Sequence, residues 1–112
     1  MRKYPATLVK VVDGDTIDAI IDIGFDILIK KRIRLWGIDA PETRSRDKGE
    51  VKSGKRSKKR LKEILDVSDG KFEIILHGRG KFGRYLGEIF VEQHEKSVNS
   101  VLIKEGLAKE YK

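Results

Sequence analysis

The sequence has no cysteine, two histidines, two prolines and one tryptophan among its 112 residues. Without cysteine there is no disulfide framework, no thiolate metal site and no cysteine nucleophile. His77 and His94 alone argue against a zinc-type site, which takes three or four nitrogen or sulfur ligands. No apolar run approaches the ~20 residues that a membrane-spanning helix needs. These absences leave the charged residues as the main source of functional information.

The length and the 38% of hydrophobic residues predict a single domain over residues 1–112 with a modest core. The start, Met1–Pro5, has basic residues but no apolar segment behind them, so it is not a signal peptide as it stands. A processed or trimmed secreted protein would look the same, and the sequence is compatible with a secreted or a cytoplasmic location. We expect a monomer with no membrane partner.

The net charge of +7 is concentrated in one segment. Between Arg44 and Arg60, nine basic residues face only Asp47 and Glu50, which accounts for the whole excess. The nine are Arg44, Arg46, Lys48, Lys52, Lys55, Arg56, Lys58, Lys59 and Arg60. Such a segment concentrates a polyanion, and nucleic acid is the expected partner. The alternative is a solubilising surface or a run that resembles a nuclear-localisation signal.

The apolar periodicity predicts five strands and two helices. The strands are expected over residues 4–12, 16–23, 27–36, 71–77 and 84–91, and the helices over 51–65 and from the cap Ser97 to Glu105; residues 37–54 read as a loop. In the third strand, Ile27, Ile29, Ile33 and Leu35 are expected to share the buried face. A helix between the third and fourth strands is the order of an OB-fold barrel. The predicted fold class is therefore mainly β with helices (α+β).

Carboxylates occur close to basic side chains at strand ends and in loops. There are four such clusters: Val12–Thr16, Arg34–Glu42, Gly80–Arg84 and the basic segment 44–60. Loop carboxylates offer the hard oxygen ligands that Ca²⁺ or Mg²⁺ prefers, and arginines clamp phosphate oxygens. Each cluster alone has an ordinary interpretation as a turn, a surface strand or a hairpin loop. Together they favour metal-assisted chemistry on a phosphate ester.

Four motifs in order are similar to a known family. Asp-Gly-Asp-Thr at 13–16, Arg-Leu-Trp-Gly-Ile-Asp-Ala-Pro-Glu at 34–42, Lys-Phe-Gly-Arg at 81–84 and the stretch Val98–Ala108 resemble the staphylococcal nuclease (thermonuclease) family. The resemblance runs from Tyr4 to Tyr111. It implies an OB-fold barrel flanked by helices. It also implies a Ca²⁺-dependent endonuclease that hydrolyses DNA or RNA, with single strands favoured, to 3′-phosphate and 5′-hydroxyl ends.

The resemblance also implies a role for each matching residue. Asp15 and Asp39 match the metal carboxylates, Ala40 matches a position whose main-chain carbonyl binds the metal, Glu42 matches the carboxylate that activates or orients water, and Arg34 and Arg84 match the arginines on the scissile phosphate. Lys81 and Phe82 match positions near the terminal phosphate of the substrate. The best-known member has tyrosine where Phe82 stands, so a phenolic hydrogen bond is lost here.

Other assignments stay open at this stage. Tyr111 is a candidate for a base-stacking tyrosine, or it is a frayed terminal residue. Asp13 and Thr16 either support the metal ligands or are ordinary turn and strand residues. Trp36 is expected to pack in the core or at the rim rather than against a base. The further C-terminal helix of the best-known member is expected to be missing.

Two functions compete with an active nuclease. One is a non-catalytic nucleic-acid-binding module on the same barrel, although degenerate modules usually lack some of the acidic or arginine positions that are present here. The other is a polyanion-sequestering domain that depends only on residues 44–60.

Overall fold

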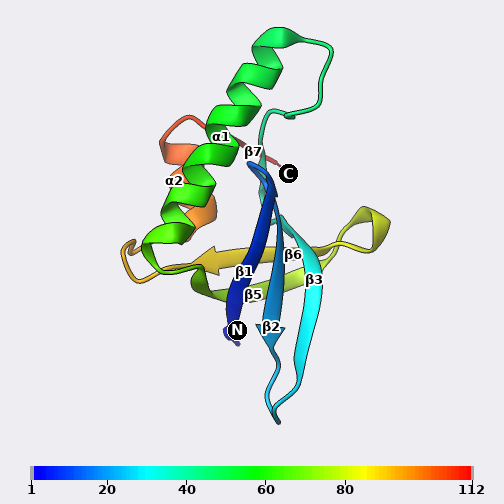
Figure 1. The fold of residues 1–112 in the computed structure, drawn as a ribbon, viewed down its shortest axis with the longest axis vertical. Coiled ribbons are helices and arrows are strands. Elements are labelled where there is room, and N and C mark those ends of the chain that lie inside the picture. The colour runs from blue at the N-terminus through cyan, green and yellow to red at the C-terminus, as the bar shows by residue number, and fades with distance from the viewer. Residues whose placement is uncertain (1, 112) are drawn as a thin grey trace.

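Five strands form a closed barrel in the computed structural model, which describes residues 2–111. The strands are β1 (Tyr4–Asp13), β2 (Thr16–Asp22), β3 (Leu28–Leu35), β5 (Lys71–Arg79) and β6 (Tyr85–Phe90), and their order around the barrel is β1-β2-β3-β6-β5. β3 and β6 pair in parallel, and the other neighbours pair antiparallel. The order and closure confirm the predicted OB-fold barrel (Figure 1).

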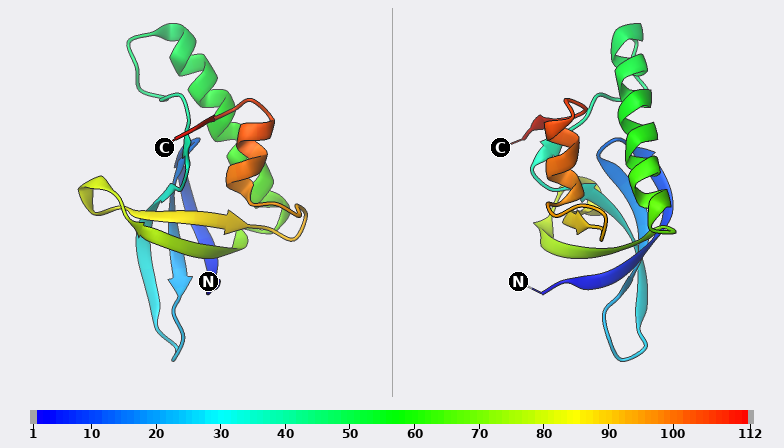
Figure 2. Two further views of the ribbon diagram at one scale, coloured as in Figure 1. Left: turned by 180° about the vertical axis from the view of Figure 1, so that it is seen from behind. Right: turned by 90° about the vertical axis from the view of Figure 1, so that its left-hand side faces the viewer.

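Two helices lie side by side against the barrel (Figure 2). α1 (Lys48–Val67) packs on β1, and α2 (Val98–Lys104) packs on β6. The side chains of Asp47 and Ser97 accept hydrogen bonds from the first-turn N–H groups of α1 and α2, respectively. The N-terminal part of α1 projects well beyond the barrel (Figure 1).

The prediction of a loop over residues 37–54 was wrong at both ends. β4 (Ile38–Asp39) pairs with β7 (Lys109–Glu110), which lies far away in the sequence. α1 begins at Lys48 rather than at residue 51, because Asp47 caps it, and it ends at Val67 rather than at residue 65. A two-residue strand carries no periodicity of its own, so only its distant partner reveals it.

The barrel interior is filled by alternate residues of the strands. Ile17, Ile33, Leu35, Ile74 and Ile89 are fully or almost fully buried. Ile27 is 49% exposed, so its expected place on this buried face was wrong. It belongs to the β2–β3 hairpin, which extends past the end of the barrel where no neighbouring strand covers it (Figure 1).

Exposed ion pairs brace the elements outside the candidate site. Arg60 on α1 donates two hydrogen bonds, of 2.7 and 2.9 Å, to the carboxylate of Glu105, which caps the C-terminus of α2. These hydrogen bonds lower the pKa of Glu105, an effect that its burial partly opposes. The contribution to stability is present at neutral pH and is lost as pH falls through the lowered pKa.

None of the helices within residues 2–111 is both long and apolar enough to cross a membrane.

Gly54 lets α1 approach the segment that follows β4. It lies in the middle of α1, and a Cβ atom there would be 2.5 Å from the carbonyl oxygen of Glu42 and 2.8 Å from that of Pro41. Glycine is normally unfavourable inside a helix, by about 1 kcal/mol relative to alanine. The close approach explains why it is found here, and it fixes the backbone that carries Glu42.

We therefore expect Gly54→Ala to lower the free energy of unfolding by about 1–3 kcal/mol, because the added methyl group meets backbone atoms that have little room to move. Urea denaturation measures this. Gly49→Ala is the matched control, because its Cβ would meet only the Asp47 carboxylate, at 3.3 Å. It should leave stability unchanged or raise it by up to about 1 kcal/mol, because alanine is the better helix former. Equal midpoints for the two variants would contradict the steric explanation.

Candidate active site

Residues from four separate segments line one small polar cavity of about 100 Å³. The segments are the β1–β2 turn, the end of β3, β4 with the chain after it, and the turn before β6. The lining residues are Asp13, Asp15, Thr16, Arg34, Asp39, Ala40, Pro41, Glu42 and Arg84. The structure thus brings together all six residues that the sequence assigned to catalysis and metal binding.

The carboxylate of Asp15 is buried, and each of its two oxygens accepts a hydrogen bond. The Thr16 hydroxyl donates to Oδ1 at 2.9 Å, and the main-chain N–H of Ala40 donates to Oδ2 at 2.9 Å. The carbonyl oxygen of Asp15 accepts a further hydrogen bond from the N–H of Leu35, at 2.7 Å. One residue therefore fastens the β1–β2 turn to the end of β3 and to the segment after β4.

Arg34 bridges the two aspartates. Its Nη2 atom is 2.9 Å from Oδ1 of Asp39 and 3.5 Å from Oδ2 of Asp15. The same nitrogen is 3.4 Å from the carbonyl oxygen of Ile38. The guanidinium supplies the positive charge that allows the two carboxylates to lie close together.

The donor set fits a hard divalent cation. Among residues 2–111, no three His, Cys, Asp or Glu side chains gather closely enough to bind a metal on their own. Two carboxylates, those of Asp15 and Asp39, therefore need main-chain carbonyls or water to complete the ligand set, and Ca²⁺ and Mg²⁺ accept both. Each carboxylate has about four lone-pair positions, so the hydrogen bonds described above leave acceptor capacity for a cation.

Glu42 and Arg84 line the same cavity although they lie far apart in the sequence. The Glu42 side chain is exposed, and its main-chain N–H donates to Oε1 of Glu50, at 3.3 Å. Arg84 is half-buried, and its Nε donates to the carbonyl oxygen of Lys81, at 3.2 Å. The Glu42 backbone and the Arg84 Nε atom are thus held by hydrogen bonds, while the Glu42 carboxylate and the rest of the Arg84 guanidinium can contact a ligand in the cavity.

Lys81, Phe82 and Tyr111 flank the cavity without lining it. Phe82 lies in the short 3₁₀ turn Lys81–Gly83, is 91% exposed and has a left-handed φ of 61°. The guanidinium of Arg84 lies 5.8 Å from the Phe82 ring centre. The Tyr111 main-chain N–H donates to the carbonyl oxygen of Gly37, at 2.8 Å, and the Arg34 guanidinium lies 5.6 Å from its ring centre. Both rings therefore border a cavity arginine.

Two supporting contacts were not expected from the sequence. The Thr43 hydroxyl donates to Oδ1 of Asp13, which anchors the chain beyond Glu42 to the β1–β2 turn. Glu50 accepts from Ser45 Oγ at 3.0 Å, in addition to the Glu42 N–H. The Asp47-x-x-Glu50 spacing at the start of α1 is similar to a capping box and is a signal that would have drawn attention to Glu50. No comparable sequence pattern marks Thr43.

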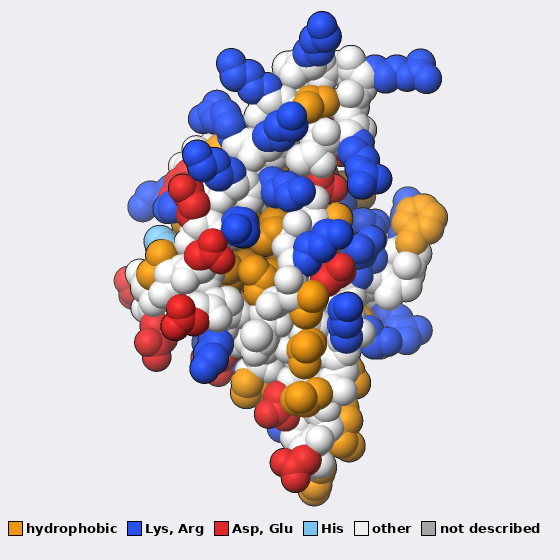
Figure 3. Space-filling view, viewed as in Figure 1, with side chains coloured by type: hydrophobic (Ala, Val, Ile, Leu, Met, Phe, Trp, Pro, Cys, Tyr) orange, Lys and Arg blue, Asp and Glu red, His pale blue; other side chains and the backbone are white. Residues whose placement is uncertain are grey.

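Positive charge surrounds the projecting end of α1. Lys and Arg side chains cover this end and continue down one side of the molecule, whereas acidic side chains gather near the other end of α1 (Figure 3). Lys48, Lys52, Lys55, Arg56 and Lys59 are exposed on the helix. Because Gly54 packs against the backbone of Glu42, this charged helix adjoins the candidate site directly.

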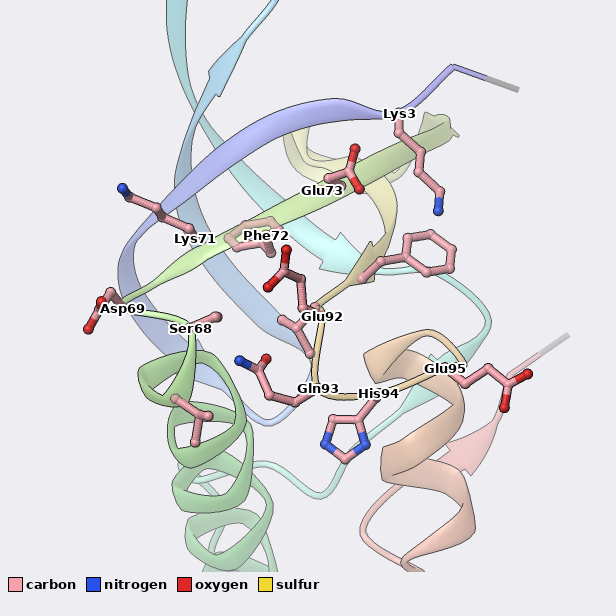
Figure 4. A pocket seen from close by; sticks show the side chains of 13 residues that line it. Lys3, Ser68, Asp69, Lys71, Phe72, Glu73, Glu92, Gln93, His94 and Glu95 are labelled. Atoms are coloured by element: carbon pink, nitrogen blue, oxygen red, sulfur yellow. The ribbon is translucent and has the colours of Figure 1, made fainter.

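Another cavity in the described part of the chain, of about 650 Å³, lies away from these residues (Figure 4). It is enclosed by the C-terminal end of α1, β5 and the segment after β6, and it contains none of the predicted site residues. Four carboxylates line it, from Asp69, Glu73, Glu92 and Glu95, against two lysines. No arginine lines it, so it has no guanidinium group to clamp a phosphate in a bidentate manner.

The closed five-stranded barrel defines the chain as an OB-fold protein, and comparisons with known proteins identify its family. The staphylococcal nuclease homologue family matches residues 32–112, so the chain belongs to that family. The match includes Arg34, Asp39, Glu42 and Arg84, whereas Asp15 lies before it. Staphylococcal-like nuclease CAN1 of Arabidopsis thaliana is 34% identical over 88 residues, which cover 77% of this chain and 24% of that protein. The chain thus spans about a quarter of the length of this relative.

We expect the two aspartates to differ in their effect on stability. Asp15→Ala leaves the Ala40 N–H and the Thr16 hydroxyl without their buried partner and should cost about 1–3 kcal/mol. Asp39→Ala should change stability by no more than about 0.5 kcal/mol, because its side chain is 57% exposed, compared with 8% for Asp15. Thermal or urea unfolding of both variants measures the difference. A larger loss for Asp39→Ala would contradict the assigned roles.

Proposed function

We propose that this chain is a calcium-dependent nuclease that hydrolyses phosphodiester bonds of DNA or RNA and leaves 3′-phosphate and 5′-hydroxyl ends. The observation that carries the proposal is the convergence of two aspartates, two arginines and one glutamate on a single cavity from distant parts of the chain. Family membership supports the proposal, because it links the same motifs to nucleases.

The arginines are suited to an anionic substrate. A phosphodiester repels an attacking oxygen, and negative charge grows on the phosphoryl oxygens as phosphorus becomes five-coordinate. Arg34 and Arg84 place guanidinium groups on the cavity wall, where they bind those oxygens and stabilise the added charge. Arg34 is already oriented by Asp39 and by the Ile38 carbonyl, so little reorganisation is required.

Glu42 is the remaining carboxylate on the cavity wall with an exposed side chain that pairs with no arginine among the described ion pairs. In the proposed reaction it accepts a hydrogen bond from the attacking water and takes its proton or orients it. Its backbone is held by Glu50 and by the close approach of Gly54, which keeps the carboxylate at the cavity.

Asp15, Asp39 and the main chain at Ala40 are the proposed ligands of the cation. The chemistry that a bound Ca²⁺ supplies in such a site is neutralisation and polarisation of a phosphoryl oxygen. The Ala40 N–H holds Asp15 in place, so an alanine side chain serves as well as any other at this position.

A non-catalytic binding module is the alternative. It is favoured by the Arg34 bridge, since that guanidinium already compensates both aspartates without a cation. The two functions differ in one assay. Single-stranded DNA is incubated with Ca²⁺, with Mg²⁺ and with a chelator, and the product ends are analysed. Cleavage with Ca²⁺ to 3′-phosphate ends supports the nuclease; salt-sensitive binding without cleavage supports the module.

Arg34→Ala should lower the cleavage rate about 10²–10³-fold, the usual effect of removing one donor to transition-state charge. Arg32→Ala is a matched control from the same strand. Its side chain is 50% exposed, pairs with Asp18 and lowers the pKa of that carboxyl, but it does not line the cavity. Single-turnover cleavage and circular dichroism test both variants. Similar rates for Arg34→Ala and the wild type would refute the assigned role.

Removing positive charge from α1 should weaken binding of the nucleic-acid substrate without slowing the cleavage step. Replacing Lys55, Arg56 and Lys59 with glutamine should raise KM, leave kcat unchanged and flatten the dependence of affinity on salt. For a single strand, removing one cation that neutralises a phosphate lowers the slope of log affinity against log salt by about 0.7. Binding measured over a range of salt concentrations tests this. Complete loss of cleavage at saturating substrate would instead favour a function carried by the basic segment alone.

A further inference from the structure

A separate groove, lined in part by Trp36, lies next to the candidate site. The groove has a volume of about 480 Å³, within the range of small-molecule sites, and its walls include Trp36, Glu88, Ser100, Glu110 and Tyr111. Trp36 is 43% exposed although it directly follows the buried Leu35. Tryptophan is enriched at interfaces because it combines a large apolar ring with one polar N–H group.

The indole ring is held rigidly. It stacks on the His77 imidazole with ring centres 3.8 Å apart and an interplanar angle of 4°. Nε2 of His77 is in turn 3.0 Å from Oε1 of Glu88. The Trp36 backbone is fixed as well, because its N–H donates to Gly87 at 2.7 Å and its carbonyl accepts from Asn99 at 2.8 Å. One ring face is thus covered by His77, and the fixed Trp36 side chain also lines the groove.

The groove is continuous with the candidate site. Trp36 is two residues from Arg34, a separation of about 6–7 Å along an extended chain. Tyr111 joins the two places, because its ring lies beside the Arg34 guanidinium and also lines the groove. A nucleic-acid strand whose phosphate contacts Arg34 would therefore bring a neighbouring nucleotide to this groove.

The charges identify which part of a nucleotide fits. Glu88 and Glu110 line the groove, and no lysine or arginine does, so a phosphate group would be repelled. A groove lined by an aromatic ring and two carboxylates suits a nucleobase. The face of the base can stack on the ring, and its N–H groups can donate hydrogen bonds to the carboxylates. A base that is stacked and paired inside a duplex cannot present its face in this way.

We propose that this groove binds one unpaired base of a single-stranded DNA or RNA substrate and that Trp36 is its stacking platform. The inference rests on the proposed function, because the strand enters through the candidate active site. It makes the groove a determinant of single-strand preference, a role separate from cleavage.

The sole tryptophan of the chain allows a direct test. A short, labelled single-stranded DNA is titrated into the protein with a chelator present to prevent cleavage, and binding is followed by anisotropy of the label. Trp36 fluorescence is recorded in the same titration. We expect quenching by the single strand, none by an equally long abasic strand that binds, and none by the same sequence as a blunt duplex.

Variants provide a second readout in the cleavage assay with Ca²⁺. Trp36→Leu should raise KM for single strands about tenfold with kcat unchanged, the effect of losing one base stack. Trp36→Phe keeps a ring and should restore most of the affinity. Phe25→Leu is the control for loss of an exposed aromatic, because Phe25 is 98% exposed on the β2–β3 hairpin and lies outside both cavities.

The outcomes separate this inference from the proposed function. Binding and cleavage without any change in Trp36 fluorescence would overturn the base site and leave the nuclease proposal standing. Equal quenching by the abasic strand would also overturn it, because the groove would then respond to the backbone. Absence of both binding and cleavage would overturn the two proposals together.

Discussion

The hydrogen bonding of one buried carboxylate underlies the arrangement of the candidate site. Asp15 accepts from the Ala40 N–H and the Thr16 hydroxyl and lies beside the Arg34 guanidinium, while its backbone carbonyl accepts from Leu35. A buried charge is tolerated only when it is paired and hydrogen-bonded, so these partners are held in fixed places around it. These hydrogen bonds fix the β1–β2 turn, the end of β3 and the segment after β4 relative to one another. The exposed Asp39 and Glu42 are carried by the last of these segments.

In the proposed nuclease, substrate capture and chemistry occupy different parts of the molecule. The positive charge lies mainly on an exposed helix that projects beyond the barrel, whereas the cavity itself is lined by four carboxylates and two guanidinium groups. Long-range attraction depends on net charge, and transition-state stabilisation depends on the placement of a few dipoles and charges. Because the two sets of charges are separate, long-range attraction can change without loss of transition-state stabilisation, and the reverse also holds. The close contact at Gly54 joins them mechanically.

The sequence predicted a five-stranded barrel, the order of strands and helices along the chain and the residues that converge on the cavity, because alternating apolar residues and ordered motifs are local signals. It did not predict β4 and β7, whose pairing joins Ile38 to Glu110, nor the hydrogen bond between Thr43 and Asp13. Those contacts depend on chain segments that only the folded barrel brings together. Ile27 was misplaced for a related reason, since its alternation continues past the point where the barrel ends. The groove beside Trp36 likewise combines residues from several elements that share no pattern.

The pairing of β4 with β7 has a consequence for the order of assembly. The β1–β2–β3 meander forms between neighbours in the sequence, but the strand that carries Asp39 and the backbone next to Tyr111 associate only after almost the whole described chain has been made. The last strand of the barrel ends at Phe90, so all five barrel strands have been made before Lys109 and Glu110 are. A nascent chain can therefore pair all five barrel strands before β4 has its partner, so the segment that carries Asp39 is the last part of the cavity wall to be fixed.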